Sequence, residues 1–180
     1  MKIRSDDVLF VMIDLQDKFR PHIGDIDRVV ANTNVLNRAA ELLNIPLVIT
    51  EQYPKGLGKT FEDIYQPEHK VMFEKTRFSI FDETIGKYID SLEKQQLVIY
   101  GIETHVCVMQ TVLDALEKNY VPIVVQDAVS SISKIDKEIA INRMLSEKAV
   151  VVSTEMLLFE LIKDAIHPDF KEISNLVKSR

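Results

Sequence analysis

The chain has 180 residues, of which 46% are hydrophobic and 28% charged, a balance typical of one compact globular domain over residues 1–180. Twenty-two Lys and Arg residues against 28 Asp and Glu residues give a formal net charge of −6, which argues against a nucleic-acid partner. No apolar stretch approaches the roughly 20 residues that cross a bilayer, so no membrane partner is expected.

The single cysteine cannot form an internal disulfide, which is typical of a protein from a reducing compartment. The first residues, MKIRSDD, lack the apolar region of a signal peptide and the Arg/Ser-rich composition of a transit peptide. These features predict a cytoplasmic protein.

Short β-branched apolar runs alternate with longer segments of helical period. Most of the runs are apolar on both faces, as expected of parallel strands that helices cover on both sides. Strands are predicted at 8–14, 46–50, 97–102, 121–128 and 149–154, with a weaker run at 69–75 as a sixth. The alternation predicts an α/β fold: three layers, with a doubly wound, mainly parallel sheet of about six strands.

Apolar residues recur at helical spacing in three of the intervening segments. The first set is Val29, Val30, Val35, Leu36, Ala39, Ala40 and Leu43; the second is Met109, Val112, Leu113 and Leu116; the third is Ile139, Ile141, Met144 and Leu145.

Two segments interrupt this rhythm. Residues 52–65 contain Pro54, Gly56 and Gly58, which are expected to preclude a regular element there. We predict a loop at the carboxyl edge of the sheet, where open α/β proteins bind ligands. The tail after Pro168 is predicted to form one last amphipathic helix.

Three reactive residue types follow separate predicted strands: Asp14, Lys75 and Cys107. The carboxyl ends of parallel strands share one edge, so these residues can meet there. A nearby ammonium and a helix N-terminus would lower the pKa of the thiol, and the carboxylate could act as general base and then general acid. Gly101 ends the strand and Thr104 is a candidate N-cap, which would place the cysteine in the first helical turn.

Each of these residues also has an ordinary structural explanation. Cys107 could be a small buried apolar residue, Asp14 a helix or turn cap, and Lys75 a solvated surface lysine. Spacing alone therefore makes a nucleophilic site plausible without establishing it.

The segments around these residues resemble the isochorismatase-like hydrolases. DLQDKF (14–19) is similar to their D-x-Q-x-x-F opening, and GIETHVC (101–107) to their G-[IV]-x-T-x-x-C nucleophile segment. Lys75 stands in the matching place after the third strand. TEQYPKGLGKT (50–60) and HPDFKEISNLVK (167–178) resemble the short members called isochorismatase domain-containing proteins. The resemblance covers nearly the whole chain.

The resemblance implies a catalytic triad of Asp14, Lys75 and Cys107. It also implies a cis peptide bond between Ile102 and Glu103. The backbone N–H groups of Glu103 and Cys107 would then form an oxyanion hole.

Three further residues are assigned roles, the first of them by the same resemblance. Phe19 matches a position whose ring lines the substrate pocket, although a core phenylalanine is an equal alternative. Tyr53 is expected to line the pocket from the Gly/Pro loop. Thr104 is expected to cap an amide other than that of Cys107, so that this N–H stays available.

The chain departs from the metal-binding nicotinamidases of the superfamily. They carry an Asp-x-His pair after the second strand, where this chain has Glu51-Gln52-Tyr53. The histidines show no i,i+4 ligand spacing; they are His22, His69, His105 and His167. We therefore expect no metal and no cofactor. The enzyme that gives the superfamily its name lacks the nucleophilic cysteine, so Cys107 points to an amide-like substrate.

The resulting prediction is a hydrolase that cleaves a small-molecule amide or related acyl compound through a thioester. The alternatives are a silent oligomeric binding or scaffold protein, or a redox-sensitive thiol at Cys107. Apolar stretches at 156–162 and at Ile173, Leu176 and Val177 predict a homo-oligomer with one of these helices at the interface. Packing of the two helices against each other is the alternative.

Overall fold

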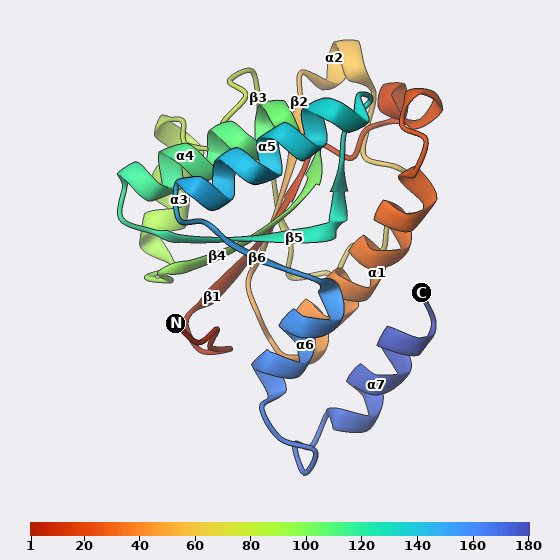
Figure 1. The fold of residues 1–180 in the computed structure, drawn as a ribbon, viewed down its shortest axis with the longest axis vertical. Coiled ribbons are helices and arrows are strands. Elements are labelled where there is room, and N and C mark those ends of the chain that lie inside the picture. The colour runs from red at the N-terminus through yellow and green to blue at the C-terminus, as the bar shows by residue number, and fades with distance from the viewer.

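The computed structural model describes all 180 residues and contains a six-stranded parallel sheet in the order β3-β2-β1-β4-β5-β6 (Figure 1). The strands are β1 (Val8–Ile13), β2 (Leu47–Gln52), β3 (Val71–Lys75), β4 (Gln96–Ile102), β5 (Val121–Ser130) and β6 (Val150–Val152). Each coincides with a predicted run, although β2 and β5 extend further than predicted and β6 is shorter. The predicted α/β fold is confirmed.

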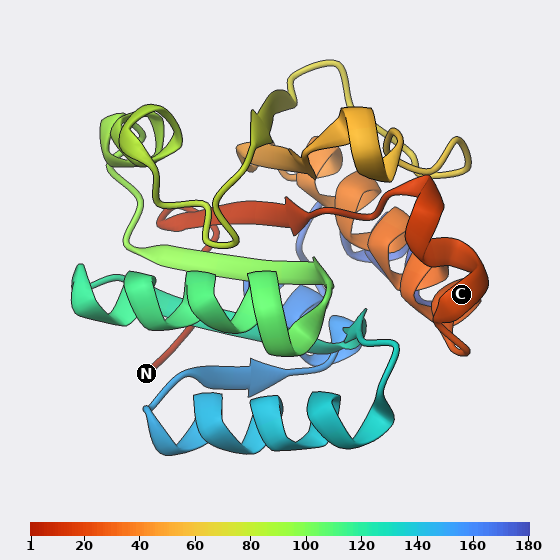
Figure 2. The same ribbon diagram turned by 90° about the horizontal axis from the view of Figure 1, so that it is seen from above.

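Helices cover both faces of the sheet (Figure 2). One face carries α1 (Ile26–Leu42), α6 (Thr154–Ile162) and α7 (Phe170–Lys178); the other carries α3 (Glu83–Ser91), α4 (Met109–Glu117) and α5 (Lys134–Ser146). The chain winds outward from β1 to β3 and then returns to β4, so the winding direction reverses between β1 and β4. Open α/β sheets bind ligands outside the carboxyl ends of the strands at such a reversal.

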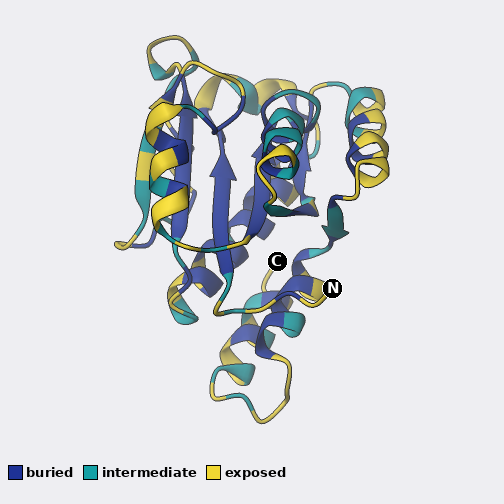
Figure 3. Cartoon of the chain, turned by 90° about the vertical axis from the view of Figure 1, so that its left-hand side faces the viewer, coloured by how far each residue is buried: buried dark blue, intermediate teal, exposed yellow.

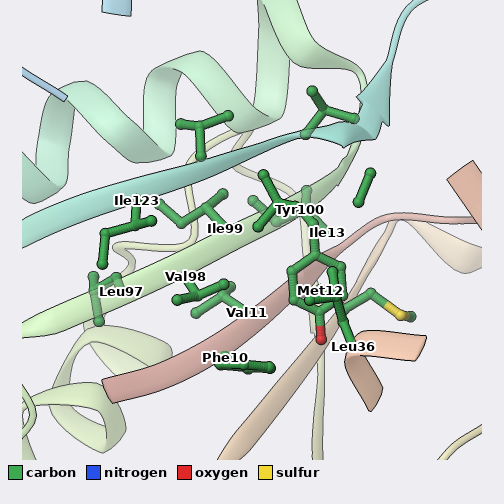
Figure 4. Close-up of a cluster of buried hydrophobic side chains, with 14 of the residues drawn as sticks. Phe10, Val11, Met12, Ile13, Leu36, Leu97, Val98, Ile99, Tyr100 and Ile123 are labelled. Atoms are coloured by element: carbon green, nitrogen blue, oxygen red, sulfur yellow. The ribbon is translucent and has the colours of Figure 1, made fainter. Parts of the chain in front are cut away.

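The core lies on both sides of the central strands, which are buried along their whole length (Figure 3). The side chains of β1 and β4 interlock there, with the rings of Phe10 and Tyr100 edge to face at 6.1 Å (Figure 4). The buried Tyr100 hydroxyl donates to Asn37 Oδ1 at 2.6 Å, so its polar atom is satisfied. This packing fixes the strand ends that carry the site.

The Gly/Pro segment contains one regular element that the sequence did not predict. A single helical turn, α2 (Pro54–Leu57), begins at Pro54, and Gly58 follows it with a φ of 82°. Proline is compatible with the first position of a helix because its missing N–H would have no intrahelical partner there. The prediction that these residues preclude a regular element is therefore wrong.

Helix α5 faces the sheet with fewer apolar residues than the spacing predicted. Ala140, Ile141 and Met144 are buried, whereas Ile139 and Leu145 are 59% and 48% exposed. Ile139 instead lies on the same exposed side of α5 as Ile135, four residues earlier, and Ile132 in the segment before the helix is exposed as well.

Helices α6 and α7 pack against each other and against α1. The Phe159 and Phe170 rings meet at 6.2 Å, and Ile173 and Val177 are buried within the chain. Mutual packing, the alternative explanation, accounts for most of these apolar residues, although Met156 is 58% exposed and Leu176 only half-buried. None of the helices combines the length and the apolar character that a membrane span requires.

Candidate active site

Asp14 follows β1 directly and is held at both carboxylate oxygens. Thr50 Oγ1 donates to Oδ1 at 2.7 Å, and Lys75 Nζ donates to Oδ2 at 2.7 Å. The residue has a φ of 50°, a left-handed conformation that aspartate tolerates better than most residues. Asp14 is 1% exposed, so it is a buried charge with one cationic partner rather than a surface cap.

Lys75 ends β3, and its side chain is fully buried. Besides Asp14, its ammonium donates to Gln52 Oε1 at 2.7 Å and to the Phe78 carbonyl at 2.9 Å, with the Arg77 carbonyl at 3.2 Å. These acceptors use all three N–H groups of the ammonium. The alternative of a solvated surface lysine is excluded.

Cys107 lies in a π-helical turn, Thr104–Val108, that follows β4. The Glu103 carbonyl accepts from the N–H groups of Val106 (3.1 Å) and Val108 (3.2 Å) but not from that of Cys107 between them. Turns of this type occur often at functional sites. The wide turn therefore leaves the Cys107 N–H free of the bond to Glu103 that an α-helix would make.

Two predictions for this segment have different outcomes. The peptide bond between Ile102 and Glu103 is cis, as predicted. The N-cap assignment for Thr104 is wrong, because Glu103 occupies the cap position and the Thr104 hydroxyl has no hydrogen-bond partner. The π turn begins one residue earlier than the predicted helix, which takes Thr104 inside it.

Only glycine fits at position 101, because β4 approaches β1 closely there. The φ of Gly101 is 116°, and a Cβ there would lie 2.0 Å from the Ile13 carbonyl oxygen. Any other residue would push apart the two strands that carry Asp14 and Cys107.

The three predicted residues converge at the carboxyl edge of the sheet. The Cys107 side chain lies near enough to Asp14 for the carboxylate to raise the pKa of the thiol, and Asp14 in turn pairs with Lys75. Burial, followed by the negative charge of Asp14, raises the pKa of Cys107 to about 12, and the positive charge of Lys75 lowers it by less. The prediction of a lowered thiol pKa is therefore wrong: the cysteine is 7% exposed, and desolvation outweighs the ammonium.

This raised pKa predicts slow alkylation of Cys107 at neutral pH. The thiolate fraction grows only as pH rises toward the pKa, so the rate with iodoacetamide should still increase between pH 9 and 10. The urea-unfolded chain is the matched control, and its sole cysteine should approach a plateau over that range. A native rate that levels off near pH 8.5 would contradict the assignment.

The two predicted pocket residues occupy different surroundings. Tyr53 is 55% exposed and lines a cleft of about 360 Å³. Phe19 is half-buried, within a 3₁₀ turn over Asp17–His22, and packs against the core. The other residues that line the cleft are Pro54, Lys55, Glu74, Lys75, Thr76 and Asp82.

Sequence reasoning missed three residues that hold the site together: Gln16, Thr50 and Gln52. Gln16 bonds through its side chain to both the backbone N–H and the carbonyl of Gln52, at 2.7 and 3.0 Å. The signal for Gln16 was available in the D-x-Q motif. Thr50 and Gln52 carry no signal of their own, since each is one polar residue at the end of an apolar run.

Glu51 does not provide a vacant metal ligand. Its Oε1 accepts from the Thr60 N–H at 2.7 Å and the Thr60 hydroxyl at 2.8 Å, which ties the loop to β2. The structure contains no group of three His, Cys, Asp or Glu side chains that could hold a metal ion.

Known proteins are similar to this chain in both sequence and fold. The chain is 38% identical to isochorismatase family protein 1B of Dictyostelium discoideum, covering 99% of this chain and 90% of the relative. It is 39% identical to isochorismatase domain-containing protein 2 of Danio rerio, covering 94% and 86%. It spans 60% of isochorismatase domain-containing protein 1 of the same fish, at 36% identity over 94% of this chain.

Solved structures give the same result. The structure described as MAR1 ribonuclease from Caenorhabditis elegans superposes with a TM-score of 0.94 at 34% identity, covering 99% of this chain and 93% of that one. Two distant structures, each 22% identical, share the fold. The octameric hydrolase YcaC of Escherichia coli has a TM-score of 0.83 (99% and 96% covered). The pyrazinamidase of Pyrococcus horikoshii in complex with zinc has a TM-score of 0.74 (82% and 99% covered).

The isochorismatase domain model matches residues 8–156, a range that contains Asp14, Lys75 and Cys107. This match and the relatives above together show that the chain belongs to the isochorismatase family.

Proposed function

We propose that this protein is a cysteine-dependent hydrolase that cleaves a small amide or related acyl compound through a thioester. The observation that carries the proposal is the placement of the Cys107 thiol near the Asp14 carboxylate, whose Oδ2 is paired with the Lys75 ammonium. A protonated thiol beside a fixed carboxylate is the arrangement that general-base activation of a nucleophile requires.

The reaction proceeds in two stages. As Cys107 Sγ attacks the substrate carbonyl, its proton passes to Asp14, and Asp14 then donates that proton to the departing amine. Asp14 next takes a proton from water, whose oxygen attacks the thioester; the C–S bond then breaks, the acid leaves, and Asp14 returns the proton to Cys107 Sγ. Lys75 keeps the Asp14 carboxylate oriented throughout, because its own N–H groups are already committed to four acceptors.

The tetrahedral oxyanion would be bound by the backbone N–H groups of Glu103 and Cys107. The absence of a bond from the Cys107 N–H to the Glu103 carbonyl in the π turn supports this role. Each such donor typically contributes about 3–4 kcal/mol to transition-state stabilisation. Phe19 and Tyr53 are proposed to line the substrate pocket; the cleft at Tyr53 has Lys75 in its lining but neither Asp14 nor Cys107.

A screen of small amides tests the function. Turnover by the native protein that is lost in Cys107→Ala supports the hydrolase, whereas inactivity toward every amide favours the scaffold alternative. A labelled RNA belongs in the same screen, because one relative is described as a ribonuclease. The net charge of −6 and a site built on a buried thiol lead us to expect no RNA cleavage.

The redox-sensitive thiol is a weaker alternative. Redox-sensor cysteines have a low pKa and are exposed to solvent. Cys107 has a raised pKa and is buried. Both properties favour a nucleophile that is activated only when substrate is present.

Catalysis is proposed to be independent of a metal or other cofactor, unlike the relative described in complex with zinc. Glu51, at the position of the metal-binding pair, is already bonded to Thr60. We expect amide turnover to survive exhaustive dialysis against a chelator. Loss of turnover that zinc, iron or manganese restores would contradict this prediction.

We further propose a cytoplasmic homo-oligomer in which residues 1–180 form a single domain. Three exposed isoleucines near the start of α5, Ile132, Ile135 and Ile139, support self-association, since exposed apolar side chains that cluster commonly mark interaction sites. Light scattering should give a mass above the 20.7 kDa of one chain. The paired change Ile135→Glu and Ile139→Glu should lower that mass, while Ile166→Glu, at an exposed position elsewhere, should not. A native mass of one chain would refute the proposal.

A further inference from the structure

The ammonium of Lys75 depends on one neutral side chain as well as on its ion-pair partner. Of its four acceptors, two are backbone carbonyls, one is the Asp14 carboxylate and one is the side-chain amide oxygen of Gln52, at 2.7 Å. Water does not solvate a fully buried ammonium. The four acceptors therefore supply its hydrogen bonds and determine the position of Lys75 Nζ.

The orientation of the Gln52 amide is fixed by its two neighbours. Nε2 donates to the Thr76 carbonyl at 2.7 Å, while Oε1 faces Lys75 Nζ. Reversing the amide would set its N–H group against the ammonium and its oxygen against a carbonyl, so that both contacts would be repulsive. Only one orientation satisfies the site.

The backbone of Gln52 is equally constrained. Gln16 accepts from its N–H and donates to its carbonyl, and the same Gln16 amide nitrogen also donates to the Gly58 carbonyl at 2.7 Å. Gln52 lies beside Lys75 in the register of β2 and β3. A continuous chain of hydrogen bonds therefore runs from the loop after α2 through Gln16 and Gln52 to Lys75.

We propose that Gln52 is a positioning residue for this site: a neutral acceptor that holds the Lys75 ammonium against Asp14 and leaves Asp14 as its sole anionic partner. This role rests on the proposed hydrolase and adds to it a residue outside the triad. Neutrality matters because a second carboxylate would compete with Asp14 for the ammonium. It would also add negative charge near Cys107, where the charges of Asp14 and Glu103 already disfavour the thiolate.

The test measures alkylation of the sole cysteine by iodoacetamide at pH 9, which requires no knowledge of the substrate. Gln52→Met keeps the size of the side chain but removes its acceptor and donor, so Lys75 is held less well near the thiol. We expect alkylation about threefold slower or more. Gln126→Met, at an exposed glutamine on β5, is the matched control and should react at the native rate.

A merely structural role makes a different prediction. It would lower the thermal midpoint of Gln52→Met while leaving the alkylation rate of the folded protein unchanged, and that result would overturn the proposal, as would a faster rate. If Gln52→Met does not fold, the isosteric Gln52→Glu decides: slower alkylation supports the requirement for neutrality, and the native rate refutes it. Failure of the amide screen with slower alkylation in these variants would reject the hydrolase but keep the positioning role.

Discussion

Replacing Lys75 with methionine should destabilise the protein by about 3–5 kcal/mol, because it leaves the Asp14 carboxylate buried without a cation. Both side chains are almost fully buried, so solvent offers little compensation. The free energy of unfolding from urea titration gives the value directly.

Two control variants distinguish the loss of the buried ion pair from the loss of a lysine at the surface. Lys87→Met removes an exposed partner of Glu83, and exposed pairs of this kind are worth roughly 0.3–0.5 kcal/mol. The double change Asp14→Asn with Lys75→Met removes both buried charges and should be less destabilised than Lys75→Met alone. If Lys75→Met unfolds like the native protein, the buried ion pair is assigned wrongly.

Asp14→Asn should move turnover and thiol reactivity in opposite directions. Removing the base should lower turnover of an amide substrate by about 10²–10⁴-fold, the range of general acid–base catalysis. Removing the negative charge should at the same time lower the pKa of Cys107, because the charge of Asp14 raises it. Alkylation at pH 9 should therefore become faster.

The opposite signs make this variant informative. A defect that exposed Cys107 would also speed alkylation, so the free energy of unfolding of Asp14→Asn is measured alongside and should stay high enough to keep the site closed. Cys107→Ala provides the blank for both assays, since it removes the only cysteine. Retention of native turnover in Asp14→Asn would remove Asp14 from the mechanism.

The fold was predictable because strand periodicity is a local property of the sequence. Six apolar runs gave the strands, and their parallel arrangement implied one edge at which Asp14, Lys75 and Cys107 could meet. Helix α2 was missed because Pro54 was taken as a breaker, although proline is accepted at the first helical position.

The chemistry of the site was less predictable than its position. Sequence suggested a lowered thiol pKa from the neighbouring ammonium, but the sign depends on burial and on the distance to each charge, which only the folded chain defines. The role of Gln52 depends likewise on partners at Thr76 and Lys75, which are brought to it by the pairing of β2 with β3.

Helices α6 and α7 show that an apolar pattern does not identify the surface that covers it. Apolar residues beyond one helical face suggested an oligomer interface, yet the second face of α6 is covered by α7 of the same chain. Periodicity shows that a surface is covered without showing by what. The isoleucines exposed near the start of α5 were not recognised, because Ile139 was grouped with inward-facing residues.

The central claim is that the acyl group of the substrate passes to the sulfur of Cys107. Acid quenching of a single turnover, followed by intact-protein and peptide mass spectrometry, measures this directly. We predict a mass increase equal to the acyl group, located on the peptide that contains Cys107 and removed by hydroxylamine, as expected of a thioester. Amide turnover with no adduct on that peptide, or turnover that persists in Cys107→Ala, would contradict the mechanism.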